Sequence, residues 1–225
     1  MAAYSITQIE QDVRCLLDEN KVTTSLAGFG DADTLELSAA IRSRILEAVA
    51  YVHQTAPYYL LDNSSSSTDT TITWEGNENY GSVSIPNDCL RVLAFKMSDW
   101  RRVVTTFHDM STPLYALQRS VIPGVRGNFE KPVCFIGIKN NNTNISHVVE
   151  FYSCKSKDAT VALYSYLKEP AIDASSGQEK VDISSKCYDA FLYHLCGLLL
   201  ATFNDANRSS LFMEHSKHLL ETSTP

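Results

Sequence analysis

Apolar residues recur at helical spacing towards both ends of this chain, whereas the middle of the chain follows the spacing of β-strands. A helix buries one face when apolar residues recur every three to four positions, and a half-buried strand needs them at every second position. One kind of element cannot satisfy both periods. The chain must therefore combine helices and strands, with the helices contributed by the two terminal parts.

The first 57 residues predict two helices. Ser5 can cap the first helix, with Gln8 as its capping-box partner, and the apolar pattern extends this helix over residues 6–19. Asp33 is a suitable N-cap for the second helix, and Pro57 would end it. The apolar positions of the second helix form one stripe, which we expect to face the core: Leu37, Ile41, Ile45, Val49 and Val52.

Two more helices are predicted near the C-terminus. The first begins at Asp182 or Ser184 and continues to Phe203, and the last includes Leu211 and Leu219. The apolar run within the first of these is thirteen residues long, which suits a buried core helix and is too short to span a bilayer. We therefore expect no membrane association.

The middle of the chain predicts strands. Residues 90–97 are expected to form a hairpin with residues 100–106, which are rich in β-branched and aromatic side chains. Three further strands are expected at 131–139, 145–154 and 160–168. Together these segments predict a meander-like antiparallel sheet of five or six strands.

The predicted fold class is therefore α+β, with an α-helical bundle formed by the N- and C-terminal helices and an inserted antiparallel β-rich domain. Residues 1–62 and 180–225 are expected to form the bundle, and residues 63–179 the insert. Residues 63–69 are serine-rich with no apolar side chain to bury, so we expect a flexible linker or a loop tip there.

Charge is distributed unevenly along the chain. The formal net charge is −7, which makes the whole chain a poor candidate for wrapping nucleic acid. Residues 1–69 carry a net −6 and residues 171–225 a net −3, whereas residues 70–170 carry a net +2. This difference would suit packing of the insert of one copy against the bundle of another.

No constellation of residues predicts catalysis, a metal site or a cofactor. The six histidines are dispersed, and the six cysteines form no C-x-x-C pair and have mostly apolar neighbours. His215 and His218 could share a metal, but no third ligand is evident and a polar helix face is the favoured interpretation. The N-terminus lacks the features of a signal peptide, so we expect the chain to begin in a reducing cytoplasm.

Basic residues flanking the predicted hairpin are the one sign of surface chemistry. They are interleaved with aromatic side chains, which suggests contact with an acidic neighbour, either a protein or DNA; the alternative is a solvated strand face. The residues concerned are Trp100, Arg101, Arg102, Tyr115, Arg119, Arg126 and Lys131.

The order of these elements resembles the head-to-tail adaptor proteins of short-tailed phages. The resemblance lies in the helical N-terminal hairpin, the stretch SIPNDCLRVLAFKMSDWRRVV, the strands KPVCFIGI and VVEFYSC, and the closing helix pair. Pro86, Asp88 and Trp100 occupy the places of the family's proline, acidic residue and tryptophan, and residues 132–134 those of a further strand that pairs across the sheet. The Asn-rich turns and the size are also similar to the neck ring proteins of crAss-like phages. The serine-rich loop and the short C-terminus depart from related adaptors, which often carry an extended tail that docks onto the portal.

The resemblance implies a structural, non-enzymatic virion protein. It would form a closed ring, expected to hold twelve copies, between portal and tail, assembled in the host cytoplasm. The implied partners are other copies of the chain, the portal protein, other neck ring or tail proteins, and DNA that passes through the lumen without sequence recognition. We expect Trp100, Arg101, Arg102, Tyr115, Arg119 and Arg126 to lie at subunit interfaces.

A cytosolic small-molecule-binding protein or enzyme, with a site assembled only in three dimensions, is the alternative from another class. A ring seen by light scattering or negative-stain imaging would favour the adaptor, and a monomer with a deep polar pocket would favour the enzyme. Because such adaptors can stay monomeric until the portal templates them, incubation with portal is the more decisive test.

Overall fold

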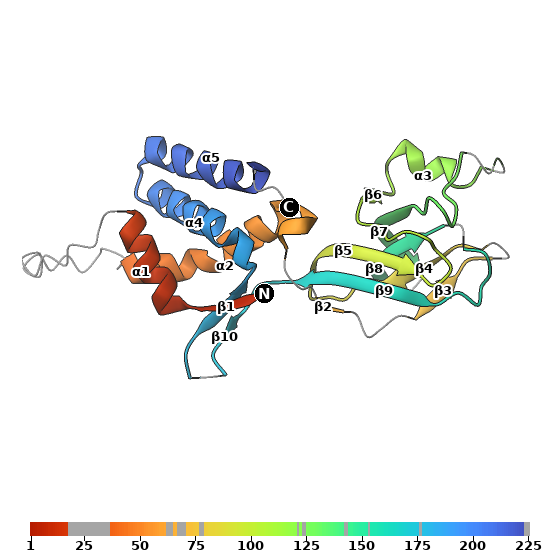
Figure 1. The fold of residues 1–225 in the computed structure, drawn as a ribbon, viewed down its shortest axis with the longest axis horizontal. Helices are drawn as coiled ribbons and strands as arrows, with labels where there is room; N and C mark the ends of the chain where they lie inside the picture. Colours follow the sequence, from red (N-terminus) through yellow and green to blue (C-terminus); the bar gives the residue numbers. More distant parts are fainter. Residues whose placement is uncertain are drawn as a thin grey trace, which may run out of the picture. The chain divides into compact units, whose positions relative to one another are not determined.

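The computed structural model describes residues 1–17, 37–61, 65–66, 71–76, 79–120, 122, 125–141, 144–152, 154–175 and 177–222 (Figure 1). These residues form a mixed α+β fold with five α-helices and several antiparallel sheets, which confirms the predicted class. The chain divides into two compact units. Met1–Asn63 and Glu169–Pro225 form unit 1, and Ser64–Lys168 forms unit 2.

The described residues of unit 1 form four helices and a small sheet. The helices are α1 (Ile6–Leu16), α2 (Leu37–Thr55), α4 (Tyr188–Thr202) and α5 (Ala206–Thr222), with 3-10 turns at Tyr58–Leu60 and Ser185–Cys187. The sheet has the antiparallel order β1-β11-β10, formed by β1 (Ala2–Ser5), β11 (Lys180–Ile183) and β10 (Ile172–Asp173). The chain returns from unit 2 to unit 1 at residue 169, because β10 and β11 pair within unit 1. The sequence predicts this second boundary of the insert near residue 180.

Local signals place the start of the first helix correctly. The Ser5 side chain accepts a hydrogen bond from the backbone N–H of Gln8 at 3.2 Å, as the capping pattern predicts. Helix α1 ends at Leu16, three residues before the predicted end, and Asp33, the expected cap of α2, lies outside the described residues. On α2 the predicted stripe is buried except at its first position, where Leu37 is half-buried.

Helix α4 lies at the centre of the unit 1 core. It is buried on most of its circumference. It also packs closely on α5, and two serine side chains of α5 donate hydrogen bonds to backbone carbonyls of α4. The Ser216 hydroxyl donates to the carbonyl of Ala190 at 2.6 Å, and the Ser209 hydroxyl donates to the carbonyl of Gly197 at 2.8 Å. A Cβ added at Gly197 would lie 2.8 Å from Met213 Cγ, so this approach requires glycine.

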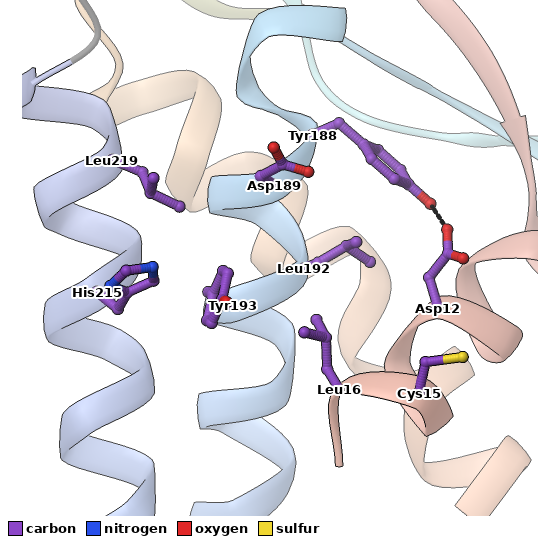
Figure 2. Close-up of a pocket in the computed structure, with 9 residues that line it drawn as sticks. All are labelled: Asp12, Cys15, Leu16, Tyr188, Asp189, Leu192, Tyr193, His215 and Leu219. Carbon is purple, nitrogen blue, oxygen red and sulfur yellow. Dashed lines mark hydrogen bonds between the residues drawn. The ribbon is translucent and has the colours of Figure 1, made fainter. Parts of the chain in front are cut away.

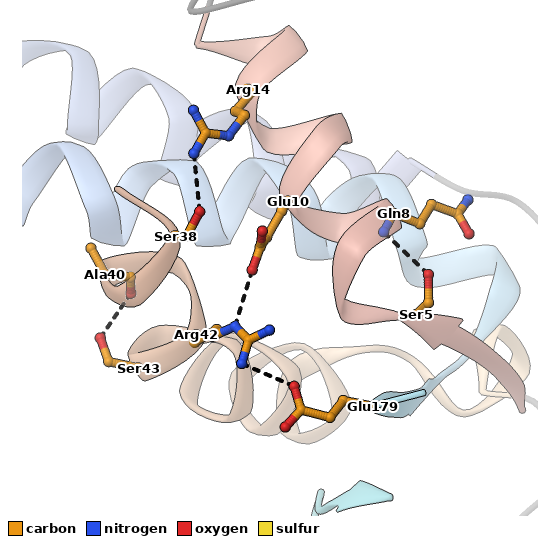
Figure 3. Close-up of polar contacts among 9 residues, drawn as sticks. All are labelled: Ser5, Gln8, Glu10, Arg14, Ser38, Ala40, Arg42, Ser43 and Glu179. Carbon is orange, nitrogen blue, oxygen red and sulfur yellow. Dashed lines mark hydrogen bonds and ion pairs between the residues drawn. The ribbon is translucent and has the colours of Figure 1, made fainter. Parts of the chain in front are cut away.

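Polar contacts connect α1 to α2 at the surface of unit 1. Arg42 Nε contacts Glu10 Oε1 at 3.2 Å, and Arg42 Nη1 contacts Glu179 Oε2 at 3.0 Å (Figure 3). Arg14 donates to the Ser38 hydroxyl at 3.0 Å on the same pair of helices. These groups are partly solvated, so they fix the register of the helices more than they stabilise the fold.

We expect unit 1 to lose stability between pH 7 and pH 5 because His53 is buried. Burial lowers the pKa of His53 to about 4, and the N-terminal charge lowers it further against an opposing effect of Asp182. The unfolded chain therefore binds a proton near pH 6.5 that the folded chain does not bind, so stability is present above that pH and is lost as the pH falls. Linkage gives a loss of about 2 kcal/mol between pH 7 and pH 5.

The measurement is denaturant unfolding followed by circular dichroism at 222 nm, which reports the helices of unit 1. His53→Leu should reduce the pH dependence by about 2 kcal/mol, whereas His218→Leu, at an exposed position on α5, should retain it. An equal slope in the His53 variant and the wild type would show that His53 is not responsible.

Unit 2 contains two sheets. The first has the antiparallel order β2-β9-β5, formed by β2 (Ser65–Ser66), β9 (Val161–Lys168) and β5 (Cys89–Met97). The second has the order β3-β4-β8-β7-β6, formed by β3 (Ile72–Trp74), β4 (Gly81–Ser84), β8 (Asn144–Phe151), β7 (Cys134–Asn141) and β6 (Phe107–Asp109). A short helix, α3 (Pro113–Leu117), follows β6.

The predicted meander is wrong. Residues 100–106 do not form a strand beside β5; their pairing with it is one bridge between Phe95 and Val104. The main partner of β5 is β9, far along the chain, and β6 runs parallel to β7. Within the serine-rich run, residues 65–66 pair with β9 as a short strand, which corrects the expected linker at those two positions; the rest of that run lies outside the described residues.

Aromatic rings dominate the core of unit 2. Phe95 and Phe151 are fully buried with ring centroids 5.7 Å apart, and Trp100 packs edge-on against both rings at 5.9 and 6.1 Å. Trp74 lies edge-on to Phe151 at 5.6 Å. Both tryptophans of the chain therefore belong to one core.

A buried ion pair lies within the second sheet. Lys139 Nζ is 2.8 Å from Glu150 Oε2 and 2.7 Å from Glu75 Oε1, and Glu150 is only 2% exposed. Burial alone would lower the pKa of Lys139, but its hydrogen bonds to the two carboxylates outweigh burial and raise it. The Tyr152 hydroxyl also donates to Glu150. These contacts join β7, β8 and the end of β3.

No helix formed by the described residues is long and apolar enough to cross a membrane.

Candidate subunit interface

The structure places the six predicted interface residues in different surroundings. Trp100 is 3% exposed and lies in the aromatic core of unit 2, so the prediction that its side chain lies at an interface is wrong. The indole turns inward because Phe95 and Phe151 provide an apolar site for it. The remaining five residues, Arg101, Arg102, Tyr115, Arg119 and Arg126, lie in three segments of unit 2 at its surface or partly exposed.

Backbone contacts join the first of these segments to the third. The N–H of Arg101 donates to the carbonyl of Phe129 at 3.0 Å, and the Arg101 guanidinium pairs with Glu130 at 3.0 Å. Asn128 Oδ1 accepts the N–H groups of Glu130 and Lys131, both at 2.9 Å, which folds this loop back on itself. Arg101 is therefore partly neutralised by a neighbouring carboxylate.

Gln118 joins the second segment to the third. This side chain is 2% exposed; its Oε1 accepts the N–H of Gly127 at 2.8 Å, and its Nε2 donates to the carbonyl of Leu114 at 3.1 Å. The buried amide thus connects the end of α3 to the residue after Arg126. As a result, Arg119 and Arg126, which are seven positions apart in sequence, are held on neighbouring backbone segments.

Exposed apolar side chains accompany these two arginines. Leu117, Ile122 and Val125 are 45%, 63% and 40% exposed. They make up three of the eleven exposed large hydrophobic side chains of the described residues and lie within nine consecutive positions of the sequence. We refer to the exposed set Leu117, Arg119, Ile122, Val125 and Arg126 as the basic tip.

Tyr115 lies between Arg119 of the basic tip and the buried side chain of Phe135. Its half-buried ring packs edge-on against Phe135 at 5.2 Å, and the Arg119 guanidinium lies 5.7 Å from the centre of the Tyr115 ring. The hydrogen bond with the Tyr115 hydroxyl raises the pKa of Arg119. Arg119 is thus held over an aromatic face, whereas Arg126 has no ion-pair or hydrogen-bond partner among the described side chains.

Arg102 lines a small pocket of unit 2. The pocket has a volume of about 290 Å³, and Arg102, His108 and Lys131 line it together with Thr105 and Thr106. The structure therefore brings together two of the basic residues that the sequence singled out, Arg102 and Lys131.

A larger pocket lies in unit 1 between α1, α4 and α5 (Figure 2). Its volume is about 550 Å³, and we refer to it as the unit 1 pocket. Its lining is part apolar, with leucines from all three helices, and part acidic, with a carboxylate from α1 and another from α4. The lining residues are Asp12, Cys15, Leu16, Tyr188, Asp189, Leu192, Tyr193, His215 and Leu219.

Aromatic contacts fix the acidic side of the unit 1 pocket. The Tyr188 hydroxyl donates to Asp12 Oδ2 at 2.6 Å, and Tyr4 stacks on the Tyr188 ring at 4.0 Å. Burial and this hydrogen bond raise the pKa of Tyr188, so the phenol remains a donor to a carboxylate. Asp189, in the first turn of α4, has no ion-pair or hydrogen-bond partner among the described residues.

The two units differ in charge. Unit 1 contains 17 acidic and eight basic residues, a net charge of −9, and unit 2 contains nine acidic and 11 basic residues, a net charge of +2. The same difference follows from the sequence segments, because the shift of Asp69 into unit 2 is balanced by the shift of Glu169 into unit 1.

Sequence reasoning missed the residues that organise both places. Gln118 gives no signal in the sequence because a buried glutamine cannot be distinguished from an exposed one without its partner, Gly127. Asp12 and Asp189 are 177 positions apart and line one pocket only because α1 packs on α4. Within the described residues, no group of three or more His, Cys, Asp or Glu side chains is placed to hold a metal ion, and His215 lines the unit 1 pocket beside Tyr193.

No protein-family model matches this chain, and a search of the curated proteins finds no related sequence.

Proposed function

We propose that this protein is a structural, non-enzymatic subunit that assembles with copies of itself into a ring in the neck of a tailed phage. The observation that carries the proposal is the basic tip, where exposed leucine, isoleucine and valine side chains accompany two arginines. A monomer gains no stability from exposing these side chains. Arginine and large apolar residues at one place are typical of protein interfaces.

The order of the elements supports the location in a phage. The helices of unit 1 come from both ends of the chain and surround one core, and unit 2 is inserted between them. We propose that the helices form the bundle and unit 2 the insert of an adaptor, as the resemblance implies. Portal protein, neighbouring neck or tail proteins and transiting DNA would then be its partners.

A ring requires that each copy present two different surfaces, because a repeated head-to-tail contact can close on itself only when it is heterologous. The basic tip provides one such surface on unit 2. The net charge of −9 makes unit 1 its electrostatic complement. The number of subunits in the ring follows from the angle between neighbouring subunits. We expect twelve subunits.

The test is a charge reversal at the basic tip. Arg119→Glu with Arg126→Glu should raise the concentration needed for assembly at least tenfold, because rim charges steer association and like charges oppose it. Assembly is measured by light scattering after size exclusion and by negative-stain imaging, with and without portal protein. Arg208→Glu with Lys217→Glu, an equal charge change at exposed positions of α5, is the matched control and should assemble normally.

Rings that persist in the variant with both tip arginines reversed would remove the basic tip from the interface. A wild-type chain that stays monomeric even with portal would contradict the proposed function itself.

The unit 1 pocket favours a second candidate function, the binding of a small cationic molecule. It is large enough for a ligand and combines two carboxylates with tyrosine rings. A ligand bound there would protect Cys15 from alkylation without any change in oligomeric state.

A further inference from the structure

The unit 1 pocket has the chemistry of a site for a basic side chain with an apolar stem. Leu16, Leu192 and Leu219 line its apolar part, and Asp12 and Asp189 supply negative charge. Arginine and lysine bury their methylene groups against apolar surface while their charged ends pair with carboxylates. No lysine or arginine of the described residues lines the pocket to neutralise the two carboxylates.

The acceptor groups at the acidic side leave oxygens available for a cation. Asp12 uses Oδ2 to accept the Tyr188 hydroxyl at 2.6 Å, so Oδ1 is available for another donor. Asp189 is exposed and has no partner among the described residues. Figure 2 shows Asp12 beside the Tyr188 hydroxyl and Asp189 in the first turn of α4, on different sides of the Tyr188 ring. A planar guanidinium can donate to two oxygens at once, which a point charge such as an ammonium does less well.

The basic tip of unit 2 presents the complementary groups. Arg119 and Arg126 carry the positive charge. Ile122 and Leu117, which are 63% and 45% exposed, provide apolar side chains that can pack against the leucines of the unit 1 pocket. The overall charges of −9 and +2 favour approach of these two surfaces. We infer that the unit 1 pocket of one copy binds the basic tip of a second copy, with the two tip arginines facing the carboxylates of Asp12 and Asp189. This inference rests on the proposed function and identifies the receiving surface of the ring contact.

The contact is heterologous, so each copy gives one tip and receives another. Its products should therefore form a series of dimers, trimers and larger species. A contact between two identical patches would stop at the dimer. This difference makes covalent trapping informative, because the size distribution reports the symmetry of the contact.

Cys15 provides a native probe for this test. It lines the unit 1 pocket and is exposed, whereas the other cysteines are buried or, for Cys89, half-buried. In an Ile122→Cys variant, mild oxidation should join the new thiol of one copy to Cys15 of the next and give a ladder of disulfide-linked species. A disulfide forms when the two Cα atoms lie within about 7 Å, so only a close contact will be trapped. Trapping also records transient encounters and does not require a stable ring.

Two controls accompany the cross-link. Adding Cys15→Ser to the Ile122→Cys variant should abolish the ladder, which would support the inference. Ile138→Cys creates a thiol of similar exposure, 60%, on β7 outside the basic tip, and it should give at least tenfold less ladder. An equal ladder from Ile138→Cys, a product that stops at dimers, or a ladder that survives Cys15→Ser would each overturn the inference. So would a faster-migrating monomer, which indicates a cross-link within one chain.

A charge exchange tests the same contact without thiols. Asp189→Lys should weaken assembly at least tenfold, and combining it with Arg119→Glu and Arg126→Glu should restore a substantial part of it. Glu214→Lys, on the exposed face of α5, is the matched control and should assemble like the wild type. Rings that form normally in Asp189→Lys and give no ladder in the cross-link would overturn this inference and leave the proposed function intact. Absence of any assembly with portal would instead remove the proposed function.

Discussion

Replacing Trp100 with alanine should destabilise unit 2 by about 3–5 kcal/mol, the usual cost of removing a buried tryptophan. The indole is 3% exposed and lies edge-on to Phe95 and Phe151, so its loss removes apolar contacts and leaves a cavity beside both rings. The remaining Trp74 belongs to the same core and reports unfolding of unit 2 by fluorescence. The helical signal at 222 nm, which comes mainly from unit 1, should keep its unfolding midpoint.

Arg101→Ala is the control for this prediction. Arg101 is the next residue, and its side chain is 71% exposed and paired only with the exposed Glu130, so its removal should change stability by less than about 0.5 kcal/mol. If Trp100→Ala instead left unfolding unchanged and prevented assembly, the tryptophan would be an interface residue, as the sequence alone predicts.

Lys139→Met should destabilise unit 2 by about 3 kcal/mol, because it leaves the Glu150 carboxylate buried without a cation. Glu150 is 2% exposed and receives only the Tyr152 hydroxyl once the ammonium has gone. The expected value lies at the lower end for a broken buried pair, since Lys139 itself is 20% exposed. Urea unfolding followed by tryptophan fluorescence measures the change.

Two further variants test whether charge is the cause. Lys139→Met combined with Glu150→Gln should recover at least about 1 kcal/mol, because a neutral amide still accepts from Tyr152 and costs less to bury. Lys168→Met breaks an exposed pair with Asp88, at 3.2 Å and with side chains about half exposed, so it should cost less than about 1 kcal/mol. Equal losses from Lys139→Met and Lys168→Met would argue that solvent screens both pairs alike.

Elements set by neighbouring residues could be predicted from the sequence. Helix α1 begins where Ser5 and Gln8 predict it, and the stripe of α2 is buried along almost its whole length. These signals depend on interactions three or four residues apart, which the sequence displays directly. The strands predicted at 131–139, 145–154 and 160–168 also lie within a few residues of β7, β8 and β9, because β-propensity and turn residues mark them.

The pairing of the strands could not be predicted in the same way. Residues 100–106 have a strong β-propensity, yet they pair with β5 only at the bridge between Val104 and Phe95, and the chain then continues to β6 in the other sheet. Propensity indicates that a segment is extended but not which strand it joins, and the partner of β5 is β9. The parallel pairing of β6 with β7 likewise depends on α3 and the loop after it, which form the connection between them.

The sequence could predict some residues of the candidate site but not their arrangement in space. The sequence identifies Arg119 and Arg126, but their common surface depends on the buried amide of Gln118, whose partner is Gly127. For Trp100 the sequence-based prediction is misleading. A tryptophan followed by two arginines suggests a surface position, whereas the side chain is buried against Phe95 and Phe151. Asp12 and Asp189 required the packing of two helices from opposite ends of the chain.

The pairing of β2 with β9 has a consequence for how the protein can vary. The chain reaches unit 2 just before Ser65 and leaves it just after Lys168, and Ser65 lies directly opposite Tyr166 in the sheet. Both ends of the insert therefore lie side by side, as they do in a module that can be exchanged as a cassette. A short bridge from residue 63 to residue 169 could therefore replace the insert.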